Sequence, residues 1–94
     1  MTTPIQNVSS TIDPLMRDVA TLRDEARVQR HLLALDLRDR LDVLERRHLE
    51  LHDSMRAARD TASESLHAAA VELRDAFRQF RDDAAAALRA PKER

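Results

Sequence analysis

Apolar residues recur at intervals of three and four along most of this chain, from Ile12 to Leu88. A 3-4 alternation averaging 3.5 residues is the period of a coiled coil, in which one apolar stripe faces a partner helix. Gln29 and His48 interrupt the stripe without shifting its phase. The pattern therefore predicts an amphipathic helical chain with one long buried seam. The large residues predicted to form the oligomer seam are Leu22, Leu33, Leu37, Leu44, Leu51, Leu66, Leu73, Phe77 and Phe80. Among them, the strongest contacts are expected from Leu33, Leu37, Leu44, Leu51, Leu73 and Phe80.

Local signals predict where this helical region begins and ends. Asp13 is a good N-cap, and Pro14 follows it at the first helical position, where its missing N–H is not needed. Pro91 stops a helix at the other end. We therefore expect a flexible N-terminal tail over residues 1–12, a helical coiled-coil region over 13–90 and a short C-terminal tail over 91–94.

One internal turn is possible, at residues 60–64. Thr61 and Glu64 have the spacing of a capping box, and Ser and Thr compete with the helical backbone for hydrogen bonds. No Gly or Pro ends the preceding helix, however. Two interpretations stay open: an unequal helical hairpin, or an uninterrupted helix of roughly 115 Å at about 1.5 Å per residue.

The composition leaves only the all-α class. The chain has no Gly, three Pro and two aromatic residues, and 35% of its residues are charged. Without Gly it lacks the residue that hairpin turns usually require. A lone helix has nothing to bury its stripe against, and an unequal hairpin leaves part of it exposed. The sequence thus predicts self-association into a coiled coil or helical bundle, as a homodimer or tetramer, or binding to another helical protein.

The charge pattern argues against nucleic-acid binding. The net charge is −1, with 16 basic and 17 acidic residues. The densest basic stretch lies around Arg46 and Arg47, and carboxylates at helical pairing distance alternate with it. The chain has no Cys and no long apolar run, and its first residues do not resemble a signal peptide. We expect a cytoplasmic protein with no cofactor and no small-molecule substrate.

A metal-binding helical bundle is an alternative interpretation. Glu45, His48 and His52 share one helical face, and two His at i, i+4 can chelate Zn²⁺ or Ni²⁺. Glu45 with His48, and Glu64 with His67, also have the Glu-x-x-His spacing of di-iron bundles. A neutral seam His48 beside an exposed His52 explains the same residues without a metal.

A second alternative is adsorption to lipid or to a hydrophobic granule surface through residues 66–88. That segment is amphipathic, but its polar face is mixed in charge rather than Lys-rich. No phosphate-binding loop or activated nucleophile is recognisable, so we expect no enzyme. The prediction that the pattern favours is a non-enzymatic structural or interaction protein that acts as an adaptor or scaffold.

Overall fold

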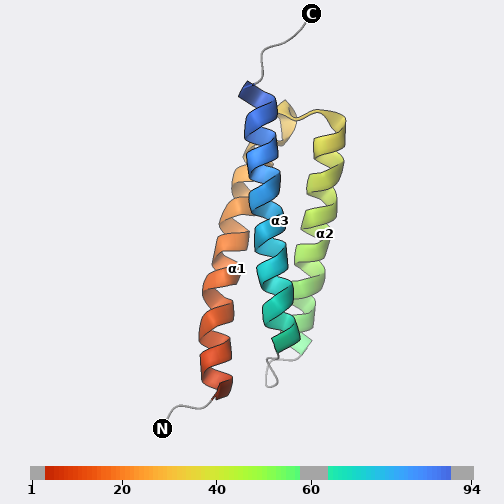
Figure 1. The fold of residues 1–94 in the computed structure, drawn as a ribbon. Coiled ribbons are helices and arrows are strands. Elements are labelled where there is room, and N and C mark those ends of the chain that lie inside the picture. The colour runs from red at the N-terminus through yellow and green to blue at the C-terminus, as the bar shows by residue number, and fades with distance from the viewer. Residues whose placement is uncertain (1–3, 58–63, 90–94) are drawn as a thin grey trace, which may run out of the picture.

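The computed structural model describes residues 4–57 and 64–89 and is helical throughout, apart from one short break. Its elements are α1 (Pro4–Gln29), the single 3₁₀ turn η1 (Arg30–Leu32), α2 (Leu35–Ala57) and α3 (Glu64–Arg89). The three helices lie side by side in an elongated bundle of 63 × 22 × 18 Å (Figure 1). α1 and α3 run in one direction and α2 in the other (Figure 1). The predicted all-α class is confirmed.

The first helix begins nine residues before the predicted N-cap, Asp13. α1 starts at Pro4 and continues through Pro14, which lies inside the helix. Residues 4–12, predicted as a tail, are therefore helical. In the sequence, Ile5 and Val8 extend the three-and-four spacing upstream of Ile12, so the apolar stripe already favours a helix there. Pro4 itself suits a first helical position, and Pro14 costs one backbone hydrogen bond within the helix.

The chain also breaks between α1 and α2, where the sequence predicted none. Gln29 leaves helical geometry at φ −93° and ψ 1°, and Leu33 is extended at φ −88° and ψ 147°. Local hydrogen bonds hold this turn: the Leu33 N–H donates to the Arg30 carbonyl, and Arg38 Nε donates to the Leu33 carbonyl. No Gly or Pro marks the turn in the sequence, so helix-breaker signals could not have located it.

Both interpretations left open by the sequence, the uninterrupted helix and the unequal helical hairpin, are wrong. α2 ends at Ala57, and α3 begins at Glu64 and packs back along α2. The predicted turn at 60–64 falls largely on residues 58–63, which lie outside the described residues, as do the predicted tail at 91–94 and residue 90. The helices α1, α2 and α3 contain 26, 23 and 26 residues. Because they are similar in length, each helix can pack along most of its neighbour.

α3 is the helix around which the bundle is organised. It packs extensively against both α1 and α2, whereas α1 and α2 contact each other much less. The apolar stripes of all three helices meet in one core, and the largest fully buried side chains come from each of them. Those side chains are Val19, Leu41, Leu73, Phe77 and Phe80.

The predicted seam residues supply most of this core. Eight of the nine are buried, and Leu66 is partly buried against the same cluster. Their partners are helices of the same chain rather than of a second one. A single copy therefore covers its own apolar stripe, and the reason for predicting that the chain must associate no longer holds. In this arrangement most of the seam is covered by the chain itself.

Candidate interaction surface

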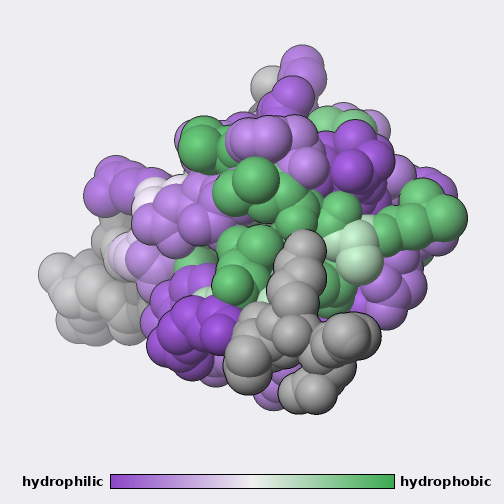
Figure 2. Space-filling view, turned by 90° about the horizontal axis from the view of Figure 1, so that it is seen from above, coloured by the Kyte–Doolittle hydropathy of each residue, from purple (hydrophilic) through white to green (hydrophobic). Residues whose placement is uncertain are grey.

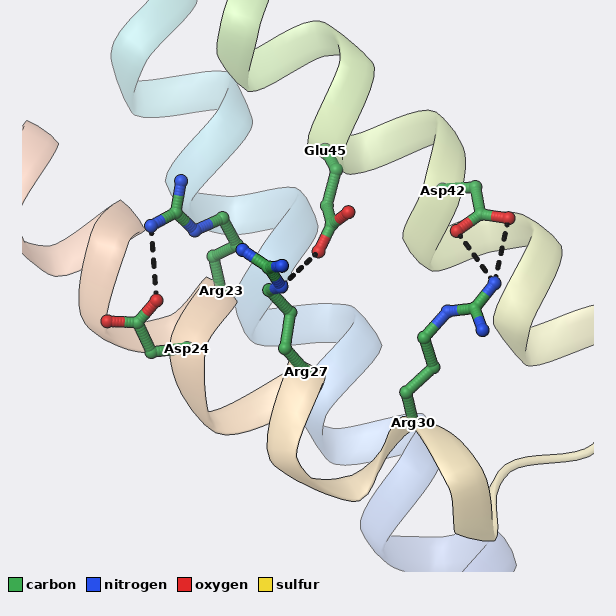
Figure 3. A network of polar contacts seen from close by, with 6 residues as sticks. All are labelled: Arg23, Asp24, Arg27, Arg30, Asp42 and Glu45. Carbon is green, nitrogen blue, oxygen red and sulfur yellow. Dashed lines mark hydrogen bonds and ion pairs between the residues drawn. The ribbon is translucent and has the colours of Figure 1, made fainter.

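Long polar side chains join α1 to α2 where their backbones do not approach closely. Arg27 Nε lies 3.5 Å from a Glu45 carboxylate oxygen, and the Arg30 guanidinium donates to the Asp42 carboxylate at 3.2 Å (Figure 3). The side chains of Arg30 and Asp42 are about half exposed. Exposed ion pairs contribute at most about 1 kcal/mol each. The α1–α2 side of the bundle is therefore the weakly held one.

A buried histidine lies between these two helices. His48 is only 7% exposed, and its Nδ1 has no hydrogen-bond partner. Arg23 Nε and a Glu45 carboxylate oxygen are likewise buried without a hydrogen bond. Burial lowers the pKa of His48 below its ordinary value, and the nearby Arg23 and His52 lower it further, although Asp24 opposes them. The fold therefore favours the neutral imidazole.

The predicted metal ligands do not form a metal-binding group. The rings of His48 and His52 are 6.4 Å apart, one buried and the other exposed, and the Glu45 carboxylate pairs with Arg27. Across the described helices, no three His, Asp or Glu side chains are placed to hold an ion. The structure gives the metal alternative no support.

Adding Zn²⁺ at about pH 8 is accordingly expected to leave the melting temperature unchanged. A ligand that binds only the folded state raises its stability, so a bound ion would shift the melt. Thermal unfolding followed by circular dichroism, with and without Zn²⁺, measures this. A rise in melting temperature that disappears in His52→Ala would contradict the expectation.

Exposed apolar side chains gather at one end of the bundle. Six large apolar residues of the described chain are exposed, and four of them surround the α1–α2 turn and the end of α3. We call this surface the apolar end. Viewed along the bundle from that side, hydrophobic side chains form a broad patch (Figure 2). Its members are Val28 (73% exposed), Leu32 (56%), Leu35 (71%) and Leu88 (42%).

A groove between α1 and α3 adjoins the apolar end. It has a volume of about 260 Å³, and Leu88 belongs to both surfaces. Its floor is apolar, and charged residues such as Glu25 and Arg81 lie at its edges. The apolar floor is formed by Leu22, Ala26, Phe80, Ala84 and Ala85. The groove extends the apolar end along the side of the bundle.

A second groove follows the outer side of the α2–α3 contact. It has a volume of about 440 Å³, with Val43, Leu44 and Ala76 at its apolar centre. Nearby, Arg40 donates to Asp83 at 3.0 Å and lies over the Phe80 ring. Hydrogen bonds, from Gln79 first and then Arg40, lower the pKa of Asp83. Polar contacts thus close this groove at one end, and only Val43 adds a large exposed apolar side chain there.

The face of residues 66–88 that was predicted to meet lipid is turned inward. Leu73, Phe77 and Phe80 are at most 2% exposed. A lipid surface could reach them only if α3 left the bundle. No described helix is both long enough and apolar enough to cross a membrane.

Sequence reasoning missed the apolar end. Val28, Leu32 and Leu35 lie off the main stripe, so the coiled-coil pattern assigned them to solvent. Their own spacing of i, i+4 and i+7 is helical and could have marked a second, short stripe. The arrival of Leu88 beside them could not have been inferred, because it depends on the turn at 30–34.

Fold and surface together define an all-α three-helix bundle with an apolar patch at one end. Comparisons with protein-family models, curated proteins and solved structures found no match to this chain.

Proposed function

We propose that this chain is a non-enzymatic structural or interaction protein that self-associates through its apolar end and serves as a scaffold or adaptor. The observation that carries the proposal is the gathering of Val28, Leu32, Leu35 and Leu88 on one surface. Single exposed apolar residues are common on any protein, but a contiguous patch marks an interaction site.

Electrostatics permit a second copy to be the partner. The net charge is −1, so two copies repel each other little at long range. The apolar end carries no concentrated charge of one sign, since Arg30 there is paired with Asp42. Covering the same patch on both copies fits a two-fold interface, in which one surface meets itself.

The proposal is tested by replacing Leu35 with glutamate. Leu35 is 71% exposed, so the substitution should leave the fold intact while placing a charge in the proposed contact. We expect Leu35→Glu to weaken dimerisation at least tenfold, because burying an unpaired carboxylate is costly. Sedimentation equilibrium over a range of concentrations measures the dissociation constant.

Leu49→Glu is the matched control. Leu49 is 60% exposed and lies in the middle of α2, away from the apolar end. It should leave the dissociation constant nearly unchanged. Equal weakening by both variants, or a wild-type chain that stays monomeric at every concentration, would contradict the proposal.

A further inference from the structure

The buried residues on the two sides of the 30–34 break are in helical phase with each other. At about 100° per residue, a single helix through residues 4–57 would place all of them within a sector of about 100°. A turn that ended one stripe and began an unrelated one would have no reason to keep this phase. The buried apolar residues concerned are Ile12, Leu15, Val19, Leu22, Ala26, Leu33, Leu37, Leu41, Leu44 and Leu51.

The ion pairs between α1 and α2 fit the same continuous helix. Arg27 and Glu45 are 18 residues apart, which is five full turns, so both would lie on one face. The Arg27–Glu45 and Arg30–Asp42 pairs are both centred on residue 36. If two such helices paired antiparallel about a two-fold axis near that residue, Arg27 of each copy would face Glu45 of the other.

The residue types of the break are compatible with straightening, which would cost the hydrogen bond from Arg38 to the Leu33 carbonyl. Residues 30–34 are Arg, His, Leu, Leu and Ala, which all tolerate a helix, and four of them favour it. A continuous helix would also give backbone partners to N–H and C=O groups at the facing ends of α1 and α2.

We propose that two copies of this chain exchange α1. Residues 30–34 straighten, α1 and α2 become one helix of about 80 Å, and each α1 packs against α2 and α3 of the other copy. Every core contact of the single chain is kept: those of α1 form between copies, and those between α2 and α3 stay within one copy. Exchange is therefore a low-cost route to a dimer.

This inference rests on the proposed self-association and specifies its geometry. On the straightened helix Val28, Leu32 and Leu35 lie opposite the buried stripe, so the exchanged dimer joins through the core seam and leaves these three residues on its outer face. An end-to-end dimer of closed bundles would bury the apolar end instead, and each bundle would keep its own α1. The test must therefore distinguish these two dimers.

Chemical crosslinking between α1 and α2 makes this distinction. The described chain has no cysteine, and none occurs in the sequence, so Arg27→Cys with Glu45→Cys provides a single reactive pair. The wild-type pair is joined by a partly exposed ion pair, and its loss costs little stability. Isolated dimer is diluted and treated at once with a short bifunctional maleimide. Exchange predicts covalent dimers on a denaturing gel, and closed bundles predict only internally linked monomers.

Ala34→Pro in the same background is the control for straightening. Proline breaks a helix at this position, yet it suits the turn because the preceding Leu33 is already extended. We expect a folded monomer with internal links only. If that variant does not fold, two glycines inserted between Leu33 and Ala34 serve the same purpose, since a longer hinge disfavours exchange.

The outcomes separate the two proposals. A wild-type dimer whose links are all internal overturns the exchange and leaves self-association standing. A chain that is monomeric at every concentration overturns both. Covalent dimers that persist in the proline and glycine variants overturn the straightening of residues 30–34.

Discussion

Replacing Phe77 by alanine is expected to lower the free energy of unfolding by about 3–5 kcal/mol. Phe77 is 1% exposed and lies in the core where α3 meets the other helices, so its loss leaves a cavity that the bundle cannot fill. A small domain has a total stability of only about 5–15 kcal/mol. The variant should therefore be close to unfolding at ambient temperature. Urea denaturation followed by circular dichroism measures the loss.

Leu49→Ala provides the comparison, because Leu49 is a large apolar residue that is 60% exposed. Its effect should stay within about 0.5 kcal/mol. In solutions dilute enough for the chain to be monomeric, the destabilisation by Phe77→Ala should not change on further dilution, because every contact of Phe77 then lies within one chain. A loss that vanishes on dilution would place Phe77 in a seam between chains instead.

Replacing His48 by leucine should stabilise the protein. The Nδ1 atom of His48 is buried without a hydrogen bond, and such an atom costs about 1–3 kcal/mol. His48 occupies the apolar stripe between Leu44 and Leu51, so leucine continues the packing there. At about pH 8, where both states hold a neutral imidazole, the free energy of unfolding should rise by about 1–3 kcal/mol.

The same substitution should weaken the dependence of stability on pH. The pKa of His48 is lowered from 6.5 in the folded chain, so the unfolded chain binds a proton more readily as the pH falls below that value. Stability is therefore highest above about pH 6.5 and declines as the pH falls toward the folded-state pKa. Melting curves at about pH 8 and about pH 5.5 measure this decline.

His52→Leu is the control for the neighbouring imidazole, which is exposed. It should keep most of the wild-type difference between the two pH values, whereas His48→Leu should reduce that difference. An unchanged difference in His48→Leu would mean that other groups cause the decline.

The sequence predicted the helical class and the buried positions because both depend on periodicity. Leu37, Leu44, Leu51 and Phe80 recur at the helical interval, and they are buried as expected. Periodicity does not specify which helix covers a stripe, since a helix of the same chain and one of another copy offer the same apolar surface. Whether the chain associates with a partner therefore stays a prediction.

The break at 30–34 could not have been read from local signals. The Arg-His-Leu-Leu-Ala segment contains no Gly or Pro, and the stripe passes through it in phase. Only the gain from packing three helices together justifies the turn. The apolar end was missed for the same reason, because Leu35 and Leu88 come to the same end of the bundle only when the chain turns. The sequence did mark His48 as a polar residue in the seam. It did not show that buried atoms of His48, Arg23 and Glu45 would lack a hydrogen bond.

An odd number of helices places the start of α1 and the end of α3 at opposite ends of the bundle (Figure 1). A force that pulls Pro4 and Arg89 apart would therefore act along the 63 Å axis. α1 and α3 run in the same direction, so such a force shears their shared interface. In shear, contacts such as that between Asp18 and Arg78 are loaded together with the whole core instead of being peeled apart one by one. A larger force is therefore expected to be needed to unfold the bundle by pulling along its long axis than by pulling α1 and α3 apart across that axis.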